Sequence, residues 1–91
     1  MRPAVVLSTA TYQRHRPDVI LGLITTRQAD AGSPTDCEIR NWREAGLHAP
    51  PSFRLYLVTA LQRDARVVGR LSEDDWREIR QRVHIGLIGP L

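Results

Sequence analysis

The 91-residue sequence has no lysine, one cysteine and one phenylalanine, and it has no long hydrophobic run. A lone cysteine, Cys37, excludes an intramolecular disulfide and a zinc site built from cysteines, which favours a reducing cytoplasm. The longest apolar run, Val19 to Ile24, is far shorter than the roughly 18 to 20 residues that span a bilayer. The four apolar residues after Pro3 are too few for a signal peptide. We therefore expect a soluble cytoplasmic protein that does not associate with membranes.

Familiar catalytic and cofactor motifs are also missing. The chain has no phosphate-cradling glycine loop, dinucleotide fingerprint or serine-hydrolase elbow. His15, His48 and His84 are too far apart to form a metal motif within one stretch of sequence. We expect neither a metal nor a cofactor. The length suffices for one small core, so we expect a single domain over residues 1–91.

The positive charge comes wholly from arginine. Thirteen arginines against ten acidic residues give a formal net charge of +3 and an isoelectric point near 10.0. Guanidinium groups bind phosphate in a bidentate manner and stack on bases, which favours nucleic acid or acidic partners. GC-rich coding is an equally good explanation of the arginine usage, so charge alone does not decide the function.

Short strand-like segments fill most of the chain, and a helix follows them. The expected strands cover residues 4–8, 19–25, 37–40, 52–59 and 67–68, joined by a polar turn-forming connection over 9–18, a loop over 28–36 and one helical turn over 41–47. The helix begins after Ser72, which forms a capping-box-like start with Asp75, and its apolar face holds Trp76, Ile79 and Val83. These elements predict an α+β fold, a partly open antiparallel barrel with a C-terminal helix.

Alternation over residues 52–59 predicts which side chains face the core. Phe53, Leu55 and Leu57 point one way, and Tyr56 points the other way beside Arg54. Tyr56 is the better candidate for stacking on a base, although an exposed tyrosine is more often only a surface residue.

The first two expected strands predict a pairing of two polar residues. If the connection over 9–18 closes symmetrically, Ser8 faces Val19 and the numbers of all paired residues sum to 27. Arg2 then faces Thr25 at one end of the sheet, next to Thr26 and the loop. A slip of one residue would separate the two, and surface positions without a function are the alternative.

Several segments, in order along the chain, resemble the PemK/MazF family of toxins. These are the run from Arg2 to Ser8, the threonines after Ile24, the strand from Ser52 to Leu61, and the run from Val68 to Ser72 that leads into the helix. The resemblance implies an SH3-like barrel, a homodimer, and the activity of an mRNA interferase, the endoribonuclease toxin of a type II toxin-antitoxin system.

The same resemblance implies functional roles for individual residues. The catalytic arginine and threonine of the family fall on Arg2 and Thr25, and Thr26, Arg27 and Gln28 become expected substrate contacts. The substrate would be single-stranded RNA, cleaved without a metal by attack of a ribose 2′-hydroxyl on the adjacent phosphate. The partner would be a cognate antitoxin protein.

The sequence departs from the family at its start. Members usually begin with an additional strand and loop before the Arg-Pro motif, whereas this sequence starts at the motif. The resemblance therefore predicts a barrel without its first strand. Two alternatives stay open: a catalytically impaired member that only binds RNA or antitoxin, and an SH3-like interaction domain with no role in nucleic-acid chemistry.

Overall fold

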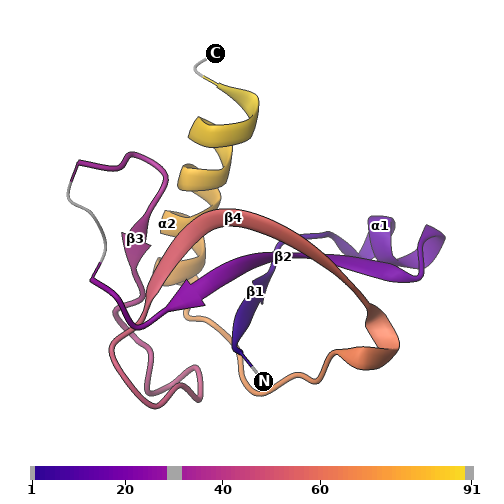
Figure 1. Cartoon of the computed structure of the whole chain (residues 1–91), viewed down its shortest axis with the longest axis horizontal. Coiled ribbons are helices and arrows are strands. Elements are labelled where there is room, and N and C mark those ends of the chain that lie inside the picture. The colour runs from indigo at the N-terminus through magenta and orange to yellow at the C-terminus, as the bar shows by residue number, and fades with distance from the viewer. Residues whose placement is uncertain (1, 29–31, 90–91) are drawn as a thin grey trace.

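The computed structural model describes residues 2–28 and 32–89, whose four strands form one antiparallel sheet in the order β1-β2-β4-β3. The strands are β1 (Ala4–Val6), β2 (Asp18–Thr25), β3 (Cys37–Glu38) and β4 (Ser52–Leu61); the helices are α1 (Ala10–His15), the 3-10 turn η1 (Gln62–Asp64), α2 (Glu73–Val83) and the π-helical turn η2 (His84–Ile88). Figure 1 shows β2 and β4 as long curved strands lying side by side, with α2 rising from the sheet. This curled sheet with a C-terminal helix confirms the predicted half-open barrel.

The core lies between α2 and one face of the sheet. Ile24, Phe53 and Cys37 are direct cross-strand neighbours on β2, β4 and β3, and all three are buried. Ile79 of α2 belongs to the same cluster and, like Phe53, is fully buried. Burial raises the pKa of the Cys37 thiol, so this cysteine is held as a neutral packing group.

Gly22 makes room for the single phenylalanine. A β-carbon at position 22 would collide with the Phe53 ring, so no larger residue fits without displacing that ring. The β2–β4 ladder shifts register at this point, because Gly22 pairs with Leu57 whereas Leu23 pairs with Arg54. The two β4 residues between these pairs have no partner on β2, which is a bulge.

The bulge adds two residues to β4, so the predicted alternation of faces continues across it. Phe53 faces the core as predicted, and Leu55 is half-buried. Leu57 lies opposite Gly22, on the same side of the sheet as Phe53, but it is 40% exposed and is not part of the core. Tyr56 lies outside, as predicted, with 63% exposure.

Other predicted elements differ in type or length. The connection over 9–18 contains the helix α1, which begins where the Thr9 hydroxyl accepts a hydrogen bond from the Tyr12 amide at 3.3 Å. The strand expected over 37–40 forms ladder pairs at only two residues. The strand expected over 67–68 is absent, because Val67 and Val68 have no neighbouring strand and are 87% and 56% exposed.

Side-chain hydrogen bonds join α1 to the start of β2 and to η1. The Tyr12 hydroxyl donates to one Asp18 carboxylate oxygen at 2.8 Å, and Arg16 Nε donates to the other at 3.2 Å. The hydrogen bond from Tyr12 holds the pKa of Asp18 below its usual 3.8, and the same bond raises the pKa of Tyr12 above 10.0. The Gln62 side chain closes the end of α1 by donating to the carbonyl oxygens of Gln13 and Arg16.

A buried carboxylate joins α2 to the segment after β3. Asp75 is 3% exposed, and its two oxygens accept from the backbone amides of Arg40 and Asn41 at 2.9 and 2.8 Å. The predicted cap is confirmed, since Ser72 Oγ accepts from the Asp75 amide at 3.2 Å and from the Asn41 side chain at 3.1 Å. One carboxylate thus fixes the docking of the helix on the sheet.

We expect Asp75→Ala to lower the free energy of unfolding by about 2 to 4 kcal/mol, because it leaves two buried amide donors without acceptors. Urea denaturation followed by circular dichroism measures this loss. The matched control is Asp74→Ala, whose side chain is 82% exposed and whose removal should cost less than about 0.5 kcal/mol. Equal losses in the two variants would contradict a structural role of the buried carboxylate.

We expect Tyr12→Phe to remove a stabilisation that depends on pH. Asp18 binds its proton more weakly in the folded state, so its contribution is present above about pH 4 and is lost as the pH falls. Tyr12 holds its proton more tightly in the folded state, so its contribution is present below about pH 10 and is lost as the pH rises. Thermal unfolding across this range should therefore show the largest difference from wild type near neutral pH.

Tyr56→Phe is the control for that series, because Tyr56 is exposed and its hydroxyl makes no hydrogen bond within the described ranges. Its melting temperature should follow that of the wild type at every pH. A Tyr12→Phe effect of constant size from pH 3 to pH 11 would show that the linkage to Asp18 is absent.

Candidate functional site

The observed register of β1 on β2 matches the predicted hairpin. Ala4 pairs with Leu23, Val5 with Gly22 and Val6 with Leu21, so the residue numbers sum to 27. The ladder begins at Ala4, and Arg2 is an exposed residue before it. Continued by two residues, the same register places Arg2 opposite Thr25. That last step stays a prediction.

Thr25 ends β2 and belongs to a polar row that crosses the sheet. It pairs with Ser52 of β4, and Ser52 pairs in turn with Glu38 of β3. Directly opposed residues in a ladder project from the same face, so the three side chains share one side of the sheet. The preceding row, through Ile24, Phe53 and Cys37, lies on the core side. The polar row therefore lies on the opposite side of the sheet, where Glu38 is exposed, Thr25 is half-buried and Ser52 is buried.

Arg54 adds a positive group to this outer face. It follows Ser52 by two residues and so projects from the same side of β4. Its Nε lies 3.7 Å from a carboxylate oxygen of Asp36, and half of its side chain stays exposed. The outer face at this end of the sheet thus combines hydroxyl, carboxylate and guanidinium groups.

The predicted substrate contacts follow Thr25 directly. Thr26, Arg27 and Gln28 are all exposed, and the chain bends at the first two. The Arg27 amide donates to Thr25 Oγ1 at 3.2 Å, so the start of the loop is tied to the predicted catalytic hydroxyl. Of the loop expected over 28–36, residues 29–31 lie outside the described residues.

Sequence reasoning missed Ser52 and Glu38 as neighbours of Thr25. The sequence pattern predicts only that Ser52 begins one strand and that Glu38 belongs to the short strand expected over 37–40. Their proximity to Thr25 depends on β4 lying between β2 and β3, and no local pattern specifies this order. Ser52 is 2% exposed, a degree of burial that a serine beside prolines does not reveal in advance.

The other candidates lie apart from this row. His15 ends α1, next to the start of β2, so it lies at the opposite end of that strand from Thr25. Its neighbour Arg16 is paired with Asp18, which neutralises part of the positive charge there. Within residues 2–28 and 32–89, no group of three or more histidine, cysteine or acidic residues has a geometry suited to a metal ion.

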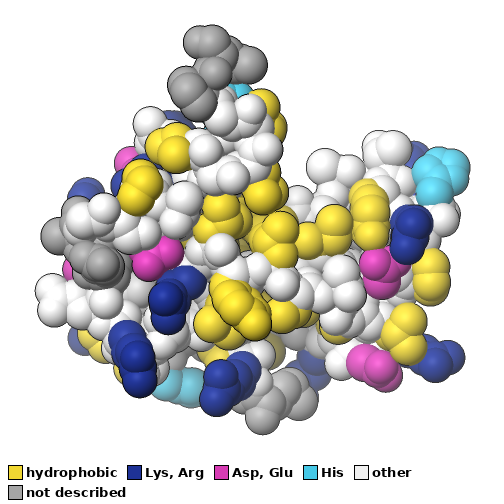
Figure 2. Space-filling view, turned by 45° about the horizontal axis from the view of Figure 1, so that its top comes forward, with side chains coloured by type: hydrophobic (Ala, Val, Ile, Leu, Met, Phe, Trp, Pro, Cys, Tyr) yellow, Lys and Arg dark blue, Asp and Glu magenta, His cyan; other side chains and the backbone are white. Residues whose placement is uncertain are grey.

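Arginine side chains gather on the side of the molecule where β2 ends. Figure 2 shows them along the lower left of the view, with few acidic side chains among them. Arg2 and Arg27 have no ion pair in the described part of the chain. Arg27, two residues after Thr25, thus offers an unpaired guanidinium group, which suits a phosphate oxygen.

Solved structures with the same fold support this interpretation of the architecture. The chain aligns over 99% of its length with 84% of a mycobacterial endoribonuclease solved in complex with its cognate antitoxin (TM-score 0.83, 17% identity). It also aligns over 99% with 89% of the Mycobacterium tuberculosis toxin MazF-mt6 (TM-score 0.76, 20% identity) and over 98% with 87% of a chain from the MazE-MazF complex of Deinococcus radiodurans (TM-score 0.74, 21% identity). The fold is therefore that of MazF-type toxins.

The family follows from the sequence match. Residues 1–87 match the family described as the PemK-like, MazF-like toxin of type II toxin-antitoxin systems, so the chain belongs to this family. Members of the MazF family are endoribonucleases. A comparison with curated proteins gives no match. Among the described residues, no helix is both long and apolar enough to cross a membrane.

Proposed function

We propose that this toxin is an endoribonuclease that cleaves single-stranded RNA without a metal, in the cytoplasm. The main supporting observation is the outward-facing Thr25 at the end of β2, whose register with β1 points towards Arg2. Family membership supplies the reaction class: attack of a ribose 2′-hydroxyl on the adjacent phosphate, which leaves a cyclic phosphate and a free 5′-hydroxyl.

The Thr25 hydroxyl is arranged to donate a hydrogen bond. Its oxygen accepts from the Arg27 amide at 3.2 Å, which leaves the hydroxyl proton free for another acceptor. Negative charge develops on the nonbridging phosphate oxygens during the attack. Thr25 as donor and Arg2 as a fixed positive charge would both stabilise that charge, and an arginine stays protonated throughout.

Substrate contacts extend along the exposed segment after β2. Arg27 offers a guanidinium group to a neighbouring phosphate, and the Thr26 and Gln28 side chains offer hydrogen bonds to bases or ribose. Tyr56 is exposed on the bulge of β4 and remains the candidate for stacking on a base.

Proton transfer needs a group with a lower pKa than arginine. We assign this role to Glu38, whose side chain shares the outer face with Thr25 and lies two strands away through Ser52. Two strand spacings are about 10 Å, so the two side chains border the same end of the sheet, on either side of the buried Ser52. A carboxylate here could accept the proton of the attacking 2′-hydroxyl.

Protein partners complete the proposal. Structures of similar toxins contain a cognate antitoxin, and we propose an antitoxin for this chain, together with homodimer formation. The support on this chain is the exposure of apolar side chains, which include Leu57 and Val58 of β4 and Leu87 and Ile88 of η2.

We expect purified protein to cleave single-stranded RNA in the presence of EDTA, and Arg2→Ala and Thr25→Ala to reduce the rate by about a hundredfold or more, since each removes stabilisation of the developing charge. Gel analysis of a labelled RNA measures the rate and shows whether the product ends in a cyclic phosphate. Arg63→Ala is the control, because Arg63 is exposed on η1 without an ion pair in the described ranges, and its rate should match the wild type.

Two results would contradict the proposal. Unchanged cleavage by both site variants would remove the assigned roles of Arg2 and Thr25. Salt-sensitive RNA binding by the wild type without any product would instead identify a catalytically impaired binding module.

We expect Glu38→Gln to lower the cleavage rate about tenfold to a thousandfold and to remove the acidic limb of the pH–rate profile, because glutamine cannot accept a proton. Glu44→Gln, an exposed carboxylate outside the sheet, should leave both rate and profile unchanged. A uniformly lowered rate with an unchanged pH profile would contradict proton transfer by Glu38.

A further inference from the structure

Arg54 lies on the same side of the sheet as Thr25, and the proposed reaction assigns it no role. It pairs with Leu23 of β2, two residues before Thr25, so Arg54 and Thr25 are diagonal neighbours across the ladder. The backbones of diagonal neighbours are about 7 to 8 Å apart, a distance that long side chains can bridge. The Arg54 guanidinium group can therefore reach RNA that is held at Thr25.

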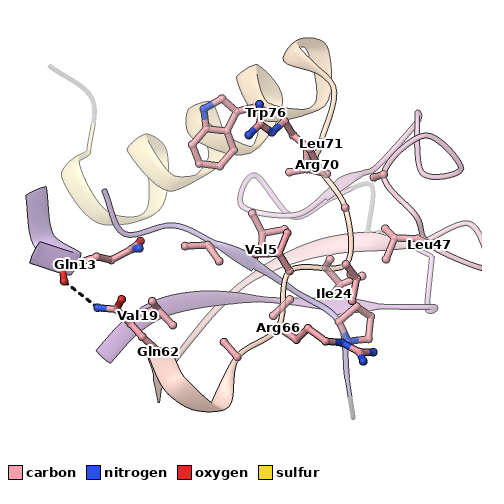
Figure 3. Close-up of a pocket in the computed structure, with 18 of the residues that line it drawn as sticks. Val5, Gln13, Val19, Ile24, Leu47, Gln62, Arg66, Arg70, Leu71 and Trp76 are labelled. Atoms are coloured by element: carbon pink, nitrogen blue, oxygen red, sulfur yellow. Dashed lines mark hydrogen bonds between the residues drawn. The ribbon is translucent and has the colours of Figure 1, made fainter. Parts of the chain in front are cut away.

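The cavity in Figure 3 belongs to the other side of the sheet. Val5, Ile24 and Trp76 line it, and its lining is mainly aliphatic. That lining includes neither Arg54 nor any residue of the row through Thr25. RNA that contacts Thr25 therefore meets the side of the sheet that carries Arg54.

Most of the hydrogen-bonding capacity of Arg54 is unused. Its Nε lies 3.7 Å from Asp36 Oδ2, which is longer than the roughly 2.7 to 3.2 Å of an N–H···O hydrogen bond. Within the described ranges the Arg54 side chain makes no hydrogen bond, and 51% of it is exposed. Its guanidinium N–H groups are thus available to a phosphate group, which they can bind in a bidentate manner.

Asp36 is the fixed member of this ion pair. Its backbone carbonyl oxygen accepts a hydrogen bond from Arg82 Nε at 3.3 Å, and Arg82 Nη1 lies 3.2 Å from a Glu78 carboxylate oxygen on α2. The Asp36 side chain is only 11% exposed. Because the arginine side chain is long and half exposed, Arg54 can turn away from the carboxylate while Asp36 stays in place.

The ion pair between Arg54 and Asp36 can be exchanged for a contact with phosphate. An ion pair with a half-exposed arginine contributes little to stability, because water screens it. A phosphodiester offers the guanidinium group the same negative charge and bidentate hydrogen bonds. The Asp36 carboxylate would then repel the bound phosphate at short range, which lowers the affinity for RNA.

We propose that Arg54 binds an RNA phosphate beside Thr25, and that Asp36 limits the affinity by competing for the guanidinium group. Arg54 adds a phosphate contact to the proposed RNA site, so this role rests on the proposed function. Tyr56 follows two residues later on β4 and is 63% exposed. A nucleotide whose phosphate binds Arg54 therefore has its base near an exposed ring on which it can stack.

Binding of an RNA that cannot react tests this role separately from cleavage. The probe is a labelled single-stranded RNA of mixed sequence with 2′-O-methyl groups, which block the attacking hydroxyl; fluorescence anisotropy follows its titration with the full chain at several salt concentrations. We expect Arg54→Ala to weaken binding about tenfold at low salt and to lower the slope of log affinity against log salt by about 0.7, the value for one phosphate contact on a single strand. Arg54→Lys should keep the slope, because it keeps the charge.

Asp36→Asn tests the competition for Arg54. It should tighten RNA binding about threefold to tenfold, and this gain should vanish in the double variant with Arg54→Ala, because the two residues then no longer interact. Asp74 and Arg77 of α2 form an exposed ion pair elsewhere on the molecule. Asp74→Asn and Arg77→Ala are the matched controls, since they change the net charge equally, and each should change the affinity by less than about twofold.

Three outcomes would overturn the role of Arg54. These are equal affinities of Arg54→Ala and Arg77→Ala, a gain from Asp36→Asn that persists without Arg54, and equal gains from Asp36→Asn and Asp74→Asn. If the wild type cleaves unmodified RNA and any of these results is found, only the role of Arg54 is wrong. If the wild type cleaves no RNA but its binding depends on Arg54 as expected, the proposed reaction is wrong and the phosphate contact stands.

Discussion

The packing of Phe53 against Gly22 is the constraint on which the rest of the structure depends. The ring fills the centre of a small core, and it fits because position 22 has no side chain. Its close approach coincides with the register shift that bulges β4 at Leu55 and Tyr56. Ser52 lies opposite Thr25, on the other side of the sheet from Phe53, and is buried there. The same register therefore places the row through Thr25 on one face of the sheet and the core row through Ile24 on the other.

The local sequence pattern correctly predicted the features that depend only on residues close together in the sequence. The cap at Ser72, the apolar face of α2 and the register of β1 on β2 are set within short segments, and all three are confirmed. Helix α1 was missed because its residues have no apolar periodicity; polar bonds to Asp18 and Gln62 fasten it instead. A strand at Val67 was predicted from β-branched residues alone, yet a strand needs a neighbour to pair with, and this segment has none.

The candidate site likewise has one part that the sequence could predict and one part that it could not. Thr25 and its relation to β1 could be predicted, because a hairpin joins strands that are consecutive in sequence. Glu38 and Ser52 could not, because their positions follow from the order β1-β2-β4-β3, in which β4 is inserted between two strands that precede it in the chain. Sequence alone therefore located one side of the site and left the other side to be found in the structure.

The acidic start of α2 makes the charge distribution of the molecule asymmetric. Glu73, Asp74 and Asp75 are consecutive at that end, and the Asp75 carboxylate already occupies the amides of residues 40 and 41. A helix N-terminus often attracts anions, but this one is capped by the Ser72 hydroxyl and bordered by two exposed carboxylates. A polyanion approaching from that side meets repulsion, whereas the arginines where β2 ends attract it. The field of the protein would thus orient a nucleic acid before any specific contact forms.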